Sequence, residues 1–96
     1  MYLVKNIVDV RNNRRSKRNL QLWEEESTKK AKCSVGGCPK DNLNGSHIQI
    51  YGDKTKKKYI IPLCDEHNEM YGEYLHIYND TYLMLAPKPN PPRRRK

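Results

Sequence analysis

Four residues, arranged as two close pairs, carry side chains that bind soft and borderline metal ions. Cys33 and Cys38 are separated by four residues, and Cys64 and His67 are separated by two. Three thiolates and one imidazole are the ligand set of a closed, tetrahedral structural zinc site. The alternative is three unrelated buried thiols and a surface histidine. Two ligand pairs at this spacing, in a chain with no further cysteine, favour one bound Zn²⁺.

The residues around the two pairs suit such a site. Gly36 and Gly37 permit a turn tight enough for both sulfurs of the first pair to face one point, as in a zinc knuckle. The second pair is expected at a strand-to-helix junction, where the strand-forming run 59–63 ends and a helix over 65–74 begins. The acidic Asp65 then lies in the first helical turn, where it complements the helix dipole.

The segments before and between the pairs predict the elements that position them. Residues 45–63 are expected to form a β-hairpin, because strand-forming runs flank a turn sequence. Residues 20–26 fit a helix, with Ser16 or Asn19 as its N-cap. We expect Trp23, the largest apolar side chain, to pack on the zinc layer.

The segments after the second pair are rich in β-forming residues. The runs 74–78 and 81–85 flank Asn79-Asp80, a good turn dipeptide, so we expect a terminal hairpin or a pair of short strands. His76 alternates with apolar neighbours and is expected to face solvent. Together with the knuckle, the hairpin and the short helix, these elements predict a small zinc-stabilised α+β domain with treble-clef architecture.

Length and composition predict one small domain with charged arms. The chain has 96 residues, 35% of them hydrophobic, and no Phe. A core of this size needs an additional stabilising element such as a metal ion. We expect a basic N-terminal segment over residues 1–18, the zinc-binding domain over 19–86, and a disordered Pro- and Arg-rich tail over 87–96.

The formal net charge of +8 is concentrated in three basic clusters, which hold 14 of the 19 Lys and Arg residues. They lie at residues 11–18, 54–58 and 88–96. Basic arms attract phosphate polymers, so we expect non-specific binding of nucleic acid. An acidic protein partner and simple solubility are the alternatives. The expected nucleic-acid contacts are Lys54, Lys56, Lys57, Lys58, Arg93, Arg94, Arg95 and Lys96.

The sequence offers no membrane segment and no secretory signal. No stretch approaches the roughly 18 apolar residues that cross a bilayer. The apolar run at the start of the chain is interrupted by Lys5 and Asp9, too early for a signal peptide. An odd number of cysteines without a secretory signal indicates reduced thiols. We therefore expect a cytoplasmic, intracellular protein.

Several of these motifs together resemble a known family. The ligand pairs, the run Gly45-Ser46-His47-Ile48 and the run Tyr59 to Asn68 resemble the HNH (ββα-metal) endonuclease fold with structural zinc. With Leu22-Trp23-Glu24, they more closely resemble small microbial and phage-type zinc proteins with a Trp-Glu helix, a Gly-Ala-His-Val strand and a Tyr-Ile-Val-Pro-Leu-Cys junction. The resemblance covers about residues 20–86 and implies a treble-clef finger. The closer group brings no established activity with it.

The resemblance to nucleases implies roles for individual residues. His47 matches the histidine general base that activates water, and Asn68 matches the final metal-binding residue. Ser46 stands where the family has an acidic metal ligand, and the middle asparagine has no counterpart near Tyr59. A hydroxyl group is a poor substitute for a carboxylate on a hard cation. We therefore expect His47 to be structural.

Two functions remain in competition at this point. The first is a non-catalytic structural-zinc module that binds nucleic acid or a protein partner. The alternative is a reduced HNH-type, metal-dependent endonuclease that uses His47 as its general base. A cysteine-dependent enzyme is disfavoured, because zinc is expected to bind all three thiols. Plasmid nicking that requires a divalent metal and is lost in His47→Ala distinguishes the two.

Overall fold

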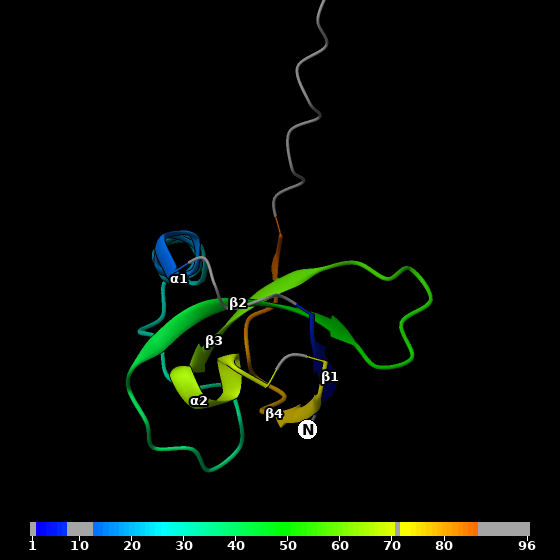
Figure 1. Ribbon diagram of the computed structural model, residues 1–96. Helices are drawn as coiled ribbons and strands as arrows, with labels where there is room; N and C mark the ends of the chain where they lie inside the picture. Colours follow the sequence, from blue (N-terminus) through cyan, green and yellow to red (C-terminus); the bar gives the residue numbers. More distant parts are fainter. Residues whose placement is uncertain (1, 8–12, 71, 87–96) are drawn as a thin grey trace, which may run out of the picture.

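The computed structural model describes residues 2–7, 13–70 and 72–86 (Figure 1). Within these ranges the chain forms one antiparallel sheet of five strands in the order β4-β1-β2-β3-β5, together with two helices. The elements in chain order are β1 (Tyr2–Asn6), α1 (Asn13–Ser27), β2 (Leu43–Ile50), β3 (Tyr59–Cys64), α2 (Asp65–Asn68), β4 (Tyr74–Ile77) and β5 (Met84–Leu85).

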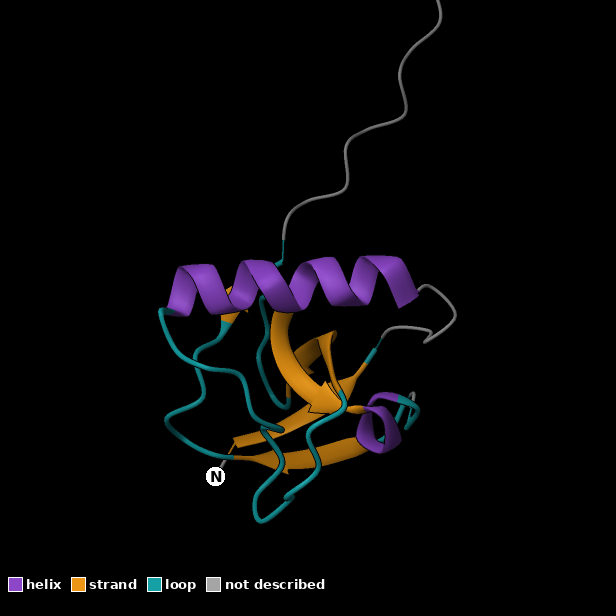
Figure 2. Ribbon diagram, turned by 90° about the vertical axis from the view of Figure 1, so that its left-hand side faces the viewer, coloured by secondary structure: helices purple, strands orange, loops and turns teal. Residues whose placement is uncertain are grey.

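The two faces of the sheet carry two separate clusters of buried residues. Ile60 and Ile61 are consecutive in β3, so their side chains point to opposite faces. Ile61 belongs to the larger cluster, which includes Cys33 and Cys64, whereas Ile60 packs with Trp23 of α1. Figure 2 shows α1 lying across one side of the sheet, with α2 on the other. The candidate metal ligands and the long helix are therefore on opposite sides.

The expected position of Trp23 on the zinc layer is wrong. Trp23 lies in the cluster under α1, against Ile60 and Met84. Its Nε1 donates a hydrogen bond to the carbonyl oxygen of Tyr82 at 2.8 Å, and the two rings meet edge to face with centroids 6.4 Å apart. Burial of the indole against apolar neighbours, with its N–H satisfied, fixes α1 to the strands rather than to the metal ligands.

The expected hairpin is confirmed, because β2 and β3 pair antiparallel from Leu43 opposite Cys64 to Ile48 opposite Tyr59. Of the two arrangements expected for residues 74–85, the pair of short strands is found, as β4 and β5, and the terminal hairpin is not formed. Instead β4 pairs with β1 at one edge of the sheet, and β5 pairs with β3 at the other. The β4 segment finds a partner in residues 2–6, which we had assigned to the basic N-terminal segment before residue 19. There Val4 and Asn6 are completely buried.

Both helices differ in length from the expectation. The long helix starts at Asn13, so Ser16 and Asn19 lie within it and are not N-caps. The short helix spans one turn, Asp65–Asn68, and not the predicted 65–74. It ends there because the chain turns back to β1. The N–H of Gly72, which has φ of 83°, donates to the carbonyl of Asn6 at 2.7 Å.

Candidate metal centre

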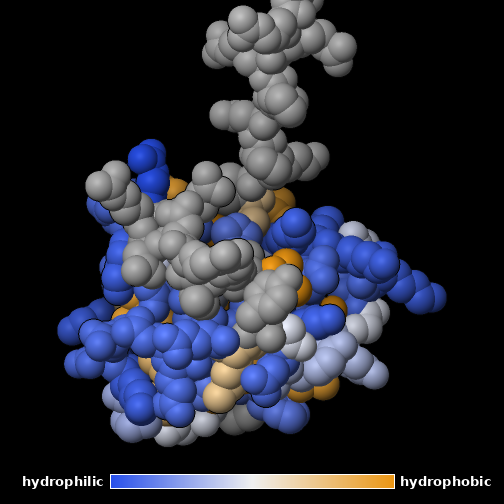
Figure 3. Space-filling model, in the orientation of Figure 1, coloured by the Kyte–Doolittle hydropathy of each residue, from blue (hydrophilic) through white to orange (hydrophobic). Residues whose placement is uncertain are grey.

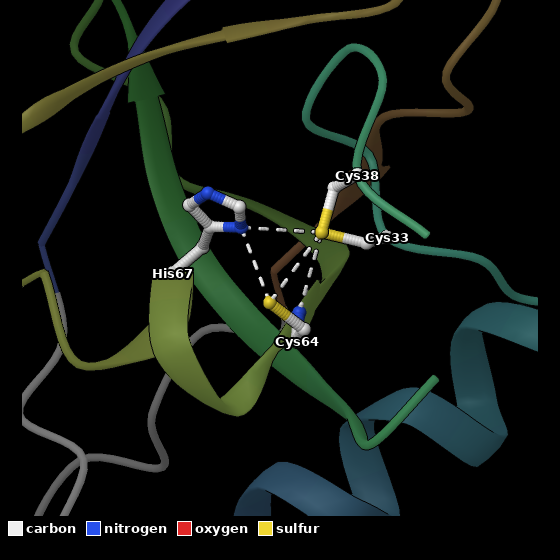
Figure 4. Close-up of side chains that lie close together, drawn as sticks. All are labelled: Cys33, Cys38, Cys64 and His67. Atoms are coloured by element: carbon white, nitrogen blue, oxygen red, sulfur yellow. Dashed lines mark hydrogen bonds between the residues drawn. The ribbon is translucent and has the colours of Figure 1, made fainter. Parts of the chain in front are cut away.

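The four predicted ligands converge on one point (Figure 4). Cys33 and Cys38 lie in the connection between α1 and β2. Cys64 is the last residue of β3, and His67 lies in α2, so the predicted strand-to-helix junction is confirmed. The three sulfur atoms and the imidazole nitrogen all lie within 4.8 Å of one another. The four residues are therefore close enough to hold one metal ion.

Two of the separations between the ligand atoms match those of a tetrahedral zinc site, and a third is shorter. The Sγ atoms of Cys38 and Cys64 are 3.8 Å apart, and Nδ1 of His67 lies 3.5 Å from Sγ of Cys33 and 3.1 Å from Sγ of Cys64. Zinc bonds to S of about 2.3 Å and to N of about 2.0–2.1 Å place tetrahedral ligands about 3.8 Å (S to S) and about 3.5 Å (S to N) apart. The donor set and its spacing are thus compatible with a structural zinc site, which His67 faces with Nδ1.

Backbone hydrogen bonds fix the loop that carries the first pair. The N–H of Ser34 donates to the carbonyl of Pro62 in β3 at 3.0 Å, and the N–H of Tyr78 donates to the carbonyl of Ser34 at 3.0 Å. Gly37 has φ of 77°, a conformation that favours glycine, which agrees with the predicted tight turn. The N–H of Cys64 donates to the sulfur of Cys33 at 3.4 Å. The knuckle is thus attached to both β3 and the end of β4.

A buried amide holds the helix that carries His67. Asn6 in β1 is completely buried, and its Nδ2 donates to the carbonyl oxygens of His67 at 3.1 Å and Asn68 at 2.9 Å. At the other end of α2, Nδ2 of Asn44 donates to a carboxylate oxygen of Asp65 at 2.6 Å. Neither Asn6 nor Asn44 could be predicted to support the site, since a polar residue within a strand-forming run carries no signal of its distant partner.

The electrostatic environment of the thiols differs between the two knuckle cysteines. Burial raises the pKa of the Cys33 thiol to about 12, although backbone hydrogen bonds from Cys64 and Val35 oppose this effect. A backbone hydrogen bond from Lys40 lowers the pKa of Cys38 below its usual value. Without a metal ion Cys33 is therefore a neutral buried thiol at pH 7, and metal binding must displace its proton.

The structure does not bring the two nuclease candidates together. In the β2–β3 pairing, Ser46 is opposite Ile61 and His47 is opposite Ile60, so Ser46 and His47 point to opposite faces. Asn68 lies on the Ser46 side, where its Oδ1 accepts a hydrogen bond from the Ser46 hydroxyl. His47 shares its face with Ile60 and α1. His47 and Asn68 therefore lie on different sides of the sheet.

The candidate nucleic-acid contacts fall into a described group and an undescribed one. Lys54, Lys56, Lys57 and Lys58 lie in the connection between β2 and β3, and all four are exposed. This connection projects from the body of the protein (Figure 1) and forms a hydrophilic end of the molecule (Figure 3). The candidates at 93–96 lie outside the described residues.

Comparisons of the chain with protein-family models, with curated proteins and with solved structures find no match. Among the described residues, no helix is long and apolar enough to cross a membrane.

Proposed function

We propose that the protein is a structural-zinc module without catalytic activity, and that it binds nucleic acid without sequence preference. The observation that carries the zinc assignment is the convergence of three thiols and one imidazole within 4.8 Å. Soft thiolate ligands select zinc over hard cations such as Mg²⁺ and Ca²⁺. Four protein ligands complete a tetrahedron and leave no open position for a substrate, as is typical of structural zinc sites.

The placement of the polar residues supports a role without catalysis. A cysteine nucleophile is disfavoured, since all three thiols belong to the metal cluster. The reduced nuclease needs His47 and Asn68 to act on one phosphodiester, but the two residues lie on opposite faces of the sheet. The Ser46 hydroxyl bonds Asn68 and so helps to attach α2 to β2. Both Ser46 and Asn68 therefore have a structural part to play.

Charge supports nucleic acid as the partner. Three thiolates and one Zn²⁺ together lower the formal charge of +8 by a single unit, so the protein remains strongly basic when loaded. The connection between β2 and β3 carries four exposed lysines and one acidic residue, Asp53. The Asp53 carboxylate accepts hydrogen bonds from the backbone N–H and the hydroxyl of Thr55. A dense cationic loop of this kind attracts phosphates irrespective of base sequence.

The apparent zinc affinity should rise with pH across the neutral range. Because the pKa of Cys33 is raised to about 12, this thiol keeps its proton at pH 7 until the metal displaces it. Each displaced proton changes the apparent affinity about tenfold per pH unit. Lowering the pH from about 7.5 to about 6.5 should therefore weaken binding at least about tenfold in competition with a chromophoric chelator. An affinity that does not change with pH would contradict Cys33 as a ligand.

Nucleic-acid binding should depend steeply on salt and on the lysines of the β2–β3 connection. We expect log Kd for duplex DNA to rise linearly with log salt, with a slope of about 0.9 per phosphate contacted. Replacing Lys54, Lys56 and Lys57 with Gln should lower that slope by up to about 2.7, as measured by fluorescence anisotropy. Binding that is insensitive to salt would reject the electrostatic mechanism.

A matched variant distinguishes binding at the β2–β3 connection from binding that depends only on the net charge of the protein. Lys29, Lys30 and Lys32 are exposed residues in the connection that follows α1, beside Asp80, where Lys29 donates to the Asp80 carbonyl. Replacing these three with Gln removes the same charge from a different surface. We expect a smaller change in slope. Equal losses in both triple variants would mean that net charge alone, and not the β2–β3 connection, attracts the polymer.

A further inference from the structure

The side of the sheet that carries α1 is only partly covered. The helix packs on β2, β3 and β5, next to Ile60 and Met84. Beyond it, Lys5 of β1 is in register with Gln49 and Tyr74, and Leu3 is in register with His76. The N–H of Tyr51 donates to the Leu3 carbonyl at 2.8 Å, which continues the same row. We name this surface the open face, and its residues are Leu3, Lys5, Gln49, Tyr51, Tyr74 and His76.

Two aromatic rings stand on the open face with a cation beside them. Tyr51 is 64% exposed and Tyr74 is 50% exposed, so each ring offers a large part of its surface to a ligand. Their ring centroids are 5.5 Å apart with an angle of 82° between the planes. The Nζ of Lys5 lies 5.8 Å from the centroid of Tyr74. The rings are held in place by one another and by this lysine, yet half or more of their surface meets solvent.

The open face is continuous with the cationic loop between β2 and β3. Gln49, on the open face, donates from Nε2 to the carbonyl of Lys56 at 3.0 Å. Tyr51 directly follows β2, where the chain enters this loop. The lysines at 54 and 56–58 therefore belong to the loop that starts at Tyr51, and the acidic residues next to these segments in the sequence are Asp53 and Glu73. Rings and cations side by side fit a ligand with both flat bases and phosphates.

We propose that the open face binds single-stranded nucleic acid, with bases stacking on Tyr51 and Tyr74 and phosphates contacting Lys5 and the loop lysines. The inference rests on the proposed nucleic-acid binding and adds a preference for single strands over the duplex, which the lysines attract by charge alone. Aromatic side chains stack on the bases of single strands irrespective of sequence. In a duplex the bases stack on one another and offer no free face to a tyrosine ring.

The test compares three probes on the zinc-loaded, full-length protein. These are a fluorescent 12-mer of thymidylate, an abasic strand with the same phosphates, and a duplex of the same length. We expect the thymidylate strand to bind at least about tenfold more tightly than the abasic strand, because only the former has bases to stack. Equal affinity for the two strands would overturn the stacking mechanism, as would a preference for the duplex.

Variants of the two tyrosines then locate the binding site. Tyr51→Leu and Tyr74→Leu keep apolar bulk but remove the aromatic ring, and each should weaken thymidylate binding about tenfold with no change in binding of the abasic strand. Tyr51→Phe and Tyr74→Phe should retain the affinity. The matched control is Tyr2→Leu, because Tyr2 is 40% exposed but in register with the buried Ile77, on the opposite face. Its affinity should equal that of the wild type.

The outcomes separate this inference from the proposed function. If the wild type binds none of the probes at low salt, nucleic-acid binding itself is rejected together with the inference. If it binds all three equally and the tyrosine variants match the control, only the inference is overturned, and the loop lysines act by charge alone. Each variant must retain one zinc per chain and the wild-type unfolding transition, which ensures that a lost affinity reports on the surface and not on the fold.

Discussion

Removing zinc from this protein should abolish its cooperative unfolding transition at neutral pH. Two of the candidate ligands, Cys33 and Cys64, are each 1% exposed and belong to the main buried cluster. The candidate metal site is therefore part of the hydrophobic core. In small zinc domains the free energy of metal binding, about 10–16 kcal/mol, is folding free energy. That is comparable with the whole stability of a typical domain, about 5–15 kcal/mol. Thermal unfolding followed by circular dichroism with excess chelator should lose its sigmoidal transition.

Two histidines of this chain provide a matched pair of variants. His67 lies in the cluster, whereas His76 is exposed on β4 and lies outside it. His67→Ala should lower zinc affinity by more than about 100-fold, which is the upper range for losing only a supporting contact around a metal. His76→Ala should keep one zinc per chain, measured by elemental analysis, and should keep the unfolding transition.

Two results would contradict the zinc assignment. One is folded wild-type protein with well under one zinc per chain. The other is a chelator-treated protein that unfolds with an unchanged midpoint. Either result would mean that Cys33, Cys38 and Cys64 are ordinary thiols. The surrounding apolar residues and hydrogen bonds would then be enough to hold them in place without a metal ion.

The four candidate metal ligands could be predicted because their geometry is local. Four residues separate Cys33 from Cys38 and two separate Cys64 from His67, so each pair is brought together by one turn of chain. The hairpin between the pairs was likewise predictable from its strand-forming runs, and its register in turn places Cys64 at the helix junction. Short-range patterns were enough to find the site.

The arrangement of the strands depends on long-range contacts that local patterns do not contain. For residues 74–78 and 81–85 the turn sequence between them predicts a hairpin or two short strands, but not which strands they pair with. In the structure β1 inserts between β4 and β2, and β5 pairs at the far edge with β3. Asn6 illustrates the reason, since its hydrogen bonds reach the carbonyls of His67 and Asn68, more than sixty positions away.

The face of the sheet to which a side chain points could be predicted only in part from the sequence. Alternation along a strand already requires Ser46 and His47 to point in opposite directions. What the sequence does not contain is which face α1 covers, and for that reason Trp23 was placed on the metal side. The helix settles against Ile60 and not Ile61, a choice made by packing between elements that lie far apart in the chain.

Gly45 is the position where α1 and β2 come closest. A Cβ atom added to this glycine would lie 2.5 Å from the backbone N of Leu20, 2.7 Å from the backbone C of Asn19 and 2.6 Å from Cβ of Asn19. Contacts this short are far inside van der Waals separation. Because two of these atoms belong to the helix backbone, no change of side-chain conformation relieves the clash, and α1 must move away from the sheet.

Gly45→Ala should therefore destabilise the zinc-loaded protein by about 3 kcal/mol, at the upper end of the range for overpacked cores. For a domain of this size, that lowers the midpoint of thermal unfolding by about 12–24 °C. Trp23 belongs to α1 and is buried against Ile60. When α1 moves, its indole ring should become more exposed, and its fluorescence emission should shift to longer wavelength. Zinc content should stay at one per chain, because the ligands lie on the opposite side of the sheet.

Gly52→Ala is the matched control, since it adds the same methyl group in open space. A Cβ atom at Gly52 meets nothing within 4 Å, but the residue has φ of 81°, so the substitution carries only a backbone penalty of about 1–2 kcal/mol. It should leave the Trp23 emission unchanged. The comparison therefore distinguishes a clash with α1, expected only at position 45, from the general cost of adding a methyl group to a glycine. The contradicting result is a Gly45→Ala protein whose free energy of unfolding lies within about 1 kcal/mol of the wild-type value and whose Trp23 emission is unchanged. In that case α1 does not lie against β2 at this distance. The division of the molecule into a helix side and a metal side would then be wrong as well.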